Sequence, residues 1–172
     1  MATHRIGGTT MDKQQVLAFL SSQNIPYEIT EHAAVYNMAE AAAIPMPYPE
    51  ADAKNLLVRD AKREHYYMIT VRGDRRVDLK AFRRQYQTRA LSFATAPELM
   101  ELLGLIPGAV TPLGLLNDER RRVALYLDKA FMEAPGRIGV HPNDNTATLW
   151  LKTEDLIAIV RGHGNAVHLA EL

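Results

Sequence analysis

Apolar residues recur along the chain with two periods, one typical of helices and one typical of strands. Val16 and Leu20 fall on one helical face directly after a capping box formed by Asp12 and Gln15, which predicts a helix as far as about Gln23. Caps, apolar spacing and composition predict further helices over residues 39–44, 77–86, 95–103 and 153–161.

Runs rich in β-branched and aromatic residues predict the strands. Residues 55–60 and 65–71 are two such runs that can pair as a hairpin, and residues 27–30 and 122–128 are two more. In residues 146–151, threonines alternate with apolar side chains, the pattern of a strand with one buried face. Strands and helices are mixed without regular alternation, so we expect an α/β fold of the mixed α+β type and not a doubly wound parallel fold.

The composition is that of an ordinary folded domain. The chain has 172 residues, of which 47% are hydrophobic and 23% charged, and this suits a single domain with a real core. Its 20 basic and 20 acidic side chains give a formal net charge of zero, so any polyanion must be met locally. Residues 1–11, rich in glycine and threonine, are expected to form a disordered extension before a domain over residues 12–172.

Several kinds of protein and site are excluded. The chain has no cysteine, which rules out disulfides, thiolate metal sites and a cysteine nucleophile. No apolar run approaches the roughly 20 residues of a membrane span, and the first residues lack the core of a signal peptide, so we expect a cytoplasmic protein without a membrane partner. The motifs G-x-S-x-G, P-loop and H-E-x-x-H are absent, and His163 and His168 have a spacing that suits no helical metal face. Neither a metal nor a cofactor is expected.

Three stretches place reactive or flexible residues where a ligand could reach them. Lys54 and Asn55 stand directly before an apolar strand, although a lysine there can also be merely solvated. Gly108 lies in the glycine- and proline-rich segment 104–118 and can present its backbone N–H to a ligand, unless the segment is only a connector. His141 precedes a proline and an Asn-Asp-Asn run, which is either a tight turn or one wall of a site.

Together these stretches resemble the YbaK/ProX deacylases, the free-standing relatives of the editing domain inserted in bacterial prolyl-tRNA synthetases. The motifs that carry the resemblance are, in the family's order, Lys54-Asn55-Leu56, "LSFAT" from Leu91 to Thr95, Gly108 to Pro112 with Gly114 and Asn117-Asp118, and "HPNDNTATL" from His141. The resemblance runs from about residue 12 to the C-terminus. It implies a mixed, partly barrel-like sheet surrounded by helices, as in that editing domain.

The resemblance also implies an activity, the hydrolysis of the ester between a wrong amino acid and the terminal adenosine of a tRNA. Alanine on a proline tRNA is the expected substrate. In the family, the position of Lys54 is essential and binds backbone phosphate near the tRNA end, and Asn55 supports binding. The loop from Gly108 to Pro112 holds the aminoacyl end, and the position of His141 helps to place substrate or water.

The expected chemistry suits a site without a strong nucleophile. An aminoacyl ester is already activated, so its hydrolysis depends mainly on orientation and on stabilisation of the developing oxyanion. In the mechanism we favour, water attacks the carbonyl carbon, the vicinal ribose hydroxyl assists, and the N–H of Gly108 faces the carbonyl oxygen. His141 is expected to position the substrate more than to act as sole base, although an ordinary histidine pKa of about 6.5 allows either role. Asn145, in the turn behind it, is counted among the substrate-binding residues.

A tRNA-binding surface is predicted in the segment from Arg72 to Arg89. This segment has seven basic residues against two acidic ones, a local excess of five positive charges that can contact phosphates. The alternative is a solvated helix face. The residues proposed for tRNA contact are Arg72, Arg75, Arg76, Arg83 and Arg84.

The residues expected around the amino-acid pocket depart from the family's usual pattern. Val35, Tyr36 and Met38 are expected to line it, with an ordinary core position as the alternative. Their stretch reads "HAAVYNMAEA" where the family often has "HPPVFTVEEA", and Glu50 and Asp52 replace a glycine and a small or histidine residue. These changes leave open a cysteinyl, seryl or non-protein aminoacyl ester as the substrate.

A function from a different class is a binding module that keeps the tRNA contact without turnover. The joint presence of Lys54, Gly108 and His141 favours the enzyme. Prolyl-tRNA synthetase is a candidate protein partner, and the sequence does not indicate an oligomeric state.

Overall fold

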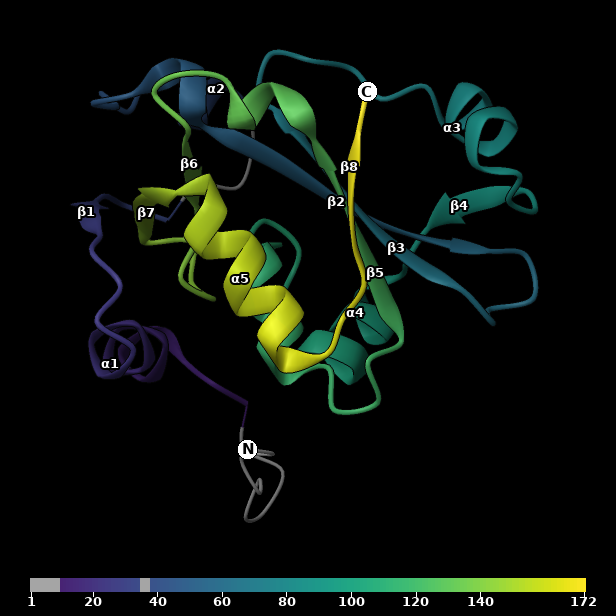
Figure 1. The fold of residues 1–172 in the computed structure, drawn as a ribbon, viewed down its shortest axis with the longest axis horizontal. Helices are drawn as coiled ribbons and strands as arrows, with labels where there is room; N and C mark the ends of the chain where they lie inside the picture. The colour runs from purple at the N-terminus through teal and green to yellow at the C-terminus, as the bar shows by residue number, and fades with distance from the viewer. Residues whose placement is uncertain (1–9, 35–37) are drawn as a thin grey trace.

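The strands in the described part of the chain form two sheets (Figure 1). This computed structural model describes residues 10–34 and 38–172. The larger sheet has the order β4-β2-β3-β5-β8, with β2 at Ala53–Asp60, β3 at Tyr66–Arg72, β4 at Leu91–Phe93, β5 at Val123–Asp128 and β8 at Val167–Ala170. The smaller sheet has the order β1-β7-β6, with β1 at Glu28–Glu31, β6 at Arg137–Val140 and β7 at Ala147–Lys152.

The larger sheet is mixed, as predicted. Strand β2 pairs antiparallel with β3 and β4, whereas the β3–β5 and β5–β8 pairs are parallel. The hairpin predicted from residues 55–60 and 65–71 is therefore confirmed. A bridge between Asp52 and Gly139 links the two sheets without closing them into a barrel.

The helices begin largely where the sequence signals place them. They are α1 (Lys13–Ser22), α2 (Met38–Ala42), α3 (Leu79–Tyr86), α4 (Ala96–Leu103) and α5 (Thr153–His163), with the 3-10 helices η2 (Pro49–Ala51), η3 (Pro112–Asn117) and η4 (Lys129–Met132). Asp12 forms the predicted capping box with Gln15, and Thr95 caps α4. Helix α5 extends two residues beyond the predicted range 153–161, because Gly162 stays helical and Gly164 forms the C-cap. None of the described helices combines the length and hydrophobicity that a membrane span needs.

The larger sheet buries apolar side chains on both faces. On one face, Val58 and Ile69 pack against Phe82 of α3, which covers this side of the sheet (Figure 1). On the other face lies the main core, which includes Leu20 of α1 and Leu156 of α5. Helix α5 contacts both β7 and β8 and thus spans from one sheet to the other (Figure 1).

Strand β7 is buried on both faces, which corrects the prediction of one buried face. Thr148 and Trp150 are as inaccessible as Leu149. The Trp150 ring lies over Gly139 of β6, where an added Cβ would be 2.2 Å from the ring, so only glycine fits at this point. The indole N–H donates a 2.9 Å hydrogen bond to Thr30 Oγ1, which pairs the buried polar groups of this face.

Strands β4, β6 and β8 and the 3-10 helices were not predicted. These strands have three or four residues each, too few to give a recognisable period.

The predicted extension, residues 1–11, lies outside the described residues as far as residue 9. Its last residue is attached to the domain. The Met11 N–H donates to Asn117 Oδ1 at 2.9 Å, and the Met11 carbonyl accepts from Asn143 Nδ2 at 3.0 Å. The boundary of the domain at residue 12 stays a prediction.

Candidate active site

Asn55 is held on the main-core face of the larger sheet. It lies opposite Thr70 in the β2–β3 register, and the Thr70 hydroxyl donates a 2.6 Å hydrogen bond to Asn55 Oδ1. The other end of the amide, Nδ2, donates to the Val110 carbonyl at 3.4 Å. Asn55 therefore ties the sheet to the loop that follows Gly108.

Thr111 continues this connection toward His141. Its side chain is fully buried, and the hydroxyl donates a 2.6 Å hydrogen bond to the His141 carbonyl. The same oxygen accepts from Leu113 N at 3.3 Å and so caps η3, whose first residue is the buried Pro112. Pro112, predicted to bind substrate, is thus placed to hold the loop in position. Thr111 was not singled out in the sequence, although it lies inside the family's Gly108–Pro112 motif.

Gly108 lies at the exposed tip of this loop. Its φ of 90° belongs to the left-handed region that favours glycine, and the turn is closed by a 3.1 Å hydrogen bond from Ala109 N to the Ile106 carbonyl. The backbone of Gly108 is accessible to a ligand while Ala109 beside it is buried.

His141 has a defined tautomer. Its Nδ1 lies 2.9 Å from the Ala147 carbonyl, which can only accept, so Nδ1 carries the proton and Nε2 keeps its lone pair. Burial lowers the pKa of His141; the bond to Ala147 opposes this shift, His32 adds to it and Asp144 opposes it, and the pKa remains below its ordinary value. The half-buried imidazole therefore favours its neutral form.

The turn after His141 is fixed by its own polar side chains. Asp144 Oδ1 accepts from Thr146 N at 2.7 Å, and Asn143 adopts a φ of 59°. Asn145 is buried, with 6% of its surface exposed. The turn predicted from the sequence is present, and it places His141 beside the Thr111 loop.

Two residues near His141 were not given roles from the sequence. The His32 ring lies 6.2 Å from the His141 ring, with its Nδ1 donating to the Ala33 carbonyl and its Nε2 accepting from the Thr148 hydroxyl at 3.1 Å. Asp52 bridges to β6 at Gly139, and burial raises its pKa to about 6 against the opposing effect of His32. In the sequence, His32 stands out only as the first residue of the stretch "HAAVYNMAEA", and Asp52 only as a departure from the family's pattern.

The side chain of Lys54 lies apart from this hydrogen-bonded set. Lys54 and Asn55 are neighbours in a strand, so their side chains point to opposite faces of the sheet. Lys54 Nζ donates to the backbone carbonyl of Arg75, in the segment that leads to α3. The structure joins Asn55, Thr111 and His141 by hydrogen bonds but not Lys54, whose role stays a prediction.

The residues predicted to line the amino-acid pocket are only partly described. Val35 and Tyr36 lie outside the described residues. Met38 is the first residue of α2. Their predicted contact with the substrate stays a prediction.

The five arginines predicted to bind tRNA do not share one surface. Arg72 ends β3 on the main-core face and is half-buried, whereas Arg83 and Arg84 are exposed on α3, which covers the opposite face. Arg75 and Arg76 are exposed in the segment between them, and Arg75 Nη1 donates to the Leu172 carbonyl at 2.7 Å.

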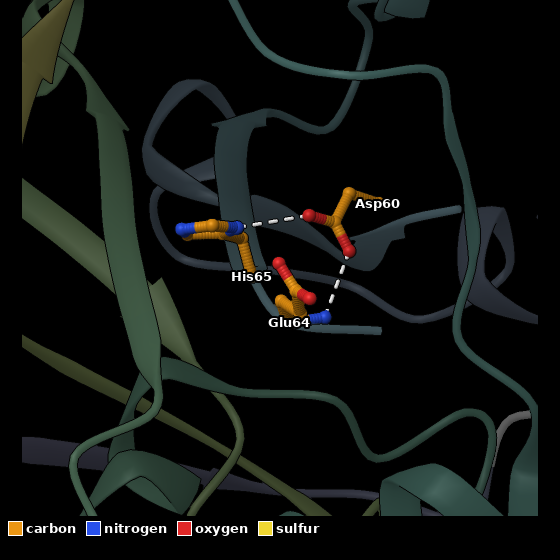
Figure 2. Close-up of side chains that lie close together, drawn as sticks. All are labelled: Asp60, Glu64 and His65. Carbon is orange, nitrogen blue, oxygen red and sulfur yellow. Dashed lines mark hydrogen bonds and ion pairs between the residues drawn. The ribbon is translucent and has the colours of Figure 1, made fainter. Parts of the chain in front are cut away.

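A separate cluster of Asp60, Glu64 and His65 lies at the turn between β2 and β3 (Figure 2). One ligand atom from each lies within 4.8 Å of the others, a spacing that a metal ion could bridge. The Asp60 carboxylate already accepts from Glu64 N at 2.9 Å and from His65 Nδ1 at 2.8 Å, and Arg89 lies 3.4 Å away. Burial raises the pKa of Asp60, but the hydrogen bonds from His65 and Glu64 outweigh burial and bring it to about 2. This cluster, with Arg89 supplying its positive charge, fastens the hairpin turn.

Comparison with known proteins decides the family. The sequence model of the family described as the aminoacyl-tRNA editing domain matches residues 32–159. The chain belongs to this family. The prolyl-tRNA editing protein ProX of Acetoanaerobium sticklandii is 40% identical over 162 residues, which cover 93% of this chain and 97% of that protein. Prolyl-tRNA synthetase associated domain-containing protein 1 of Mus musculus is 32% identical over 149 residues, or 85% of this chain and 88% of that protein.

A solved structure shares the fold of this aminoacyl-tRNA editing domain. The crystal structure of the hypothetical protein APE2540 matches with a TM-score of 0.67 at 19% identity, covering 91% of this chain and 97% of that one. The resemblance drawn from the sequence motifs is therefore confirmed at the level of family and fold. The matched range begins at His32 and contains Lys54, Asn55, Gly108 and His141.

Proposed function

We propose that this chain, an aminoacyl-tRNA deacylase of the editing family, acts in trans to remove alanine from mischarged proline tRNA. The relationship to a prolyl-tRNA editing protein over 93% of the chain supports proline tRNA as the substrate class. The observation that carries the proposal is the hydrogen-bonded path from Asn55 through Val110 and Thr111 to His141. This path holds an accessible glycine loop and a neutral histidine in fixed relation.

His141 positions the attacking water in this proposal. Its Nδ1 proton is committed to the Ala147 carbonyl, so Nε2 can accept a hydrogen bond from water. The lowered pKa keeps the imidazole neutral at physiological pH, which preserves that acceptor.

The loop tip stabilises charge on the substrate. Water oxygen attacks the ester carbonyl carbon, the carbonyl oxygen becomes an oxyanion, and the Gly108 N–H donates to it. The bond to the ribose oxygen then breaks, and this oxygen takes the proton that the water loses, with help from the vicinal hydroxyl. The products are free alanine and tRNA with an intact terminal ribose.

Lys54 contributes to binding of the tRNA. Its ammonium group is held against the Arg75 carbonyl on the α3 side of the sheet, away from His141. A lysine there contributes by meeting tRNA phosphate and does not touch the reacting carbonyl.

The test is single-turnover deacylation of one proline tRNA charged separately with alanine, cysteine, serine and proline. We expect rapid loss of alanine and survival of the prolyl ester. Preferential loss of the cysteinyl or seryl ester would show that cysteine or serine, and not alanine, is the amino acid removed. Survival of all four esters with the tRNA still bound would favour the binding module.

A further inference from the structure

A pocket lined by two arginines lies beside the candidate active site. Its walls come from η2, the end of β3, η4 and the start of β6, and they include Tyr48, Glu50, Arg72, Glu133 and Arg137. Arg72 was predicted to share one tRNA-binding surface with Arg75, Arg76, Arg83 and Arg84. The fold instead turns it to the opposite face of the sheet, where it meets Arg137 across this pocket.

Within the described residues, neither arginine has an acidic side chain at ion-pair distance. By contrast, Arg75 lies 4.0 Å from Asp128, and Arg89 pairs with Asp60 and Glu64. The Arg72 Nε is buried and has no hydrogen-bond partner. A buried N–H without a partner is costly, and a shift of the half-buried guanidinium toward an anion in the pocket would relieve that cost.

Arg137 is held in a defined orientation. Its guanidinium carbon lies 3.9 Å from the centre of the Tyr48 ring, and Tyr48 in turn packs edge-on against the buried Trp150. The Tyr48 hydroxyl donates to Glu28 at 2.8 Å, which fixes the ring. A planar guanidinium fixed in this way suits bidentate contact with phosphate oxygens.

The pocket is close to the proposed catalytic residues along two strands. Arg72 pairs with Ala53, two positions before Asn55 on the neighbouring strand. Arg137 precedes His141 by four residues, roughly 13 Å at the rise of an extended chain. This distance is comparable to one or two nucleotides of an unpaired strand.

We propose that Arg72 and Arg137 together bind a phosphate of the unpaired 3′ end of the tRNA, close to the nucleotide whose ester is hydrolysed. The inference rests on the proposed function, because it assigns that function's substrate a second contact besides Lys54. Glu50 and Glu133 are exposed at the rim, where water screens their charge, whereas the two arginines form the less accessible part of the wall.

The experiment measures binding of an uncharged proline tRNA minihelix by fluorescence anisotropy over a series of salt concentrations. Arg72→Gln and Arg137→Gln should each weaken binding by about five- to tenfold and lower the slope of log K against log salt by about 0.7, the value for one single-strand phosphate. Arg72→Lys, which keeps the charge without the planar fork, should fall between wild type and Arg72→Gln. Arg120→Gln removes an exposed arginine from the far end of β5 and should change neither quantity.

A second minihelix that lacks the unpaired 3′ nucleotides locates the contact. The two glutamine variants should bind this shortened RNA as wild type does. Equal losses on both RNAs, or unchanged salt slopes in folded variants, would overturn the inference. If wild-type protein deacylates the charged tRNA and both variants do so equally well, the inference about the two arginines is wrong while the proposed function stands. Wild-type protein that binds neither RNA would refute the proposed function as well.

Discussion

The Thr111 hydroxyl donates a 2.6 Å hydrogen bond to the backbone carbonyl of His141, 30 residues further along the chain. This bond joins the glycine loop, which supplies the proposed oxyanion donor, to the turn that carries the imidazole. The relative position of these two groups decides whether a water on His141 Nε2 can reach a carbonyl held by Gly108.

Removing this hydroxyl should uncouple the two loops. Thr111→Val leaves the His141 carbonyl without its partner, so we expect a loss of about 1–3 kcal/mol in the free energy of unfolding. The single-turnover rate constant should fall at least about tenfold with a smaller change in tRNA affinity. Thr111→Ser keeps the donor and should retain most of the rate. Equal rates for the valine variant and wild type would contradict the proposed coupling.

The deacylation rate should depend on the protonation of His141. Since the pKa of His141 is lowered, the imidazole stays neutral down to below pH 6.5, and the rate should fall only under more acidic conditions. His32 contributes to lowering that pKa, so His32→Gln should move the midpoint of the fall to higher pH. The pH profile of the single-turnover rate, with His141→Gln as the flat control, checks both points. A wild-type midpoint above pH 7 would contradict them.

Asp52 should limit stability at alkaline pH. Its pKa is raised from 3.8 to about 6 by burial, so its contribution to stability is fully present below pH 3.8 and is lost as the pH rises through about 6. Asp52→Asn, which stays neutral, should therefore be more stable than wild type at pH 8 by about 1–2 kcal/mol, after allowance for partial exposure. The difference should vanish near pH 4. Urea unfolding at the two pH values measures this, and a destabilised variant at pH 8 would rule it out.

The Asp60 cluster should act in the opposite direction. The pKa of Asp60 is lowered from 3.8 to about 2, so its carboxylate stabilises the fold above pH 3.8. This contribution is lost as the pH falls through about 2. Asp60→Asn should lower the free energy of unfolding by about 2 kcal/mol at pH 7. Glu64→Gln, which removes an exposed partner of Arg89, should cost less than about 1 kcal/mol. Equal effects of the two substitutions in thermal or urea unfolding would show that the stability of this hairpin turn does not depend on Asp60.

Most of the fold follows from local signals in the sequence. The capping box at Asp12, the threonine cap at Thr95 and the paired runs of β2 and β3 each depend on neighbours in the chain, and each was predicted correctly. The burial of β7 on both faces was not, because Thr148 is covered by segments distant in sequence.

The arrangement of the candidate site residues could not be predicted from the sequence. Lys54 and Asn55 were grouped because they are adjacent, yet strand geometry separates their side chains. The same alternation places the Arg72 side chain on the face of the sheet opposite to α3, which carries Arg83 and Arg84. Thr111 and His32 act through contacts with residues 30 and 116 positions away, which no local pattern shows.

We propose that this chain removes alanine from mischarged proline tRNA and that Lys54 binds the tRNA, away from the reacting carbonyl. The most direct measurement is single-turnover release of alanine from charged proline tRNA by wild type and by Lys54→Ala over a range of enzyme concentrations. We expect rapid release by wild type, and a folded variant that loses most activity and needs more enzyme for what remains. An alanyl ester that survives wild-type enzyme would contradict the proposed activity, and a folded Lys54→Ala protein with an unchanged rate would contradict the role of Lys54.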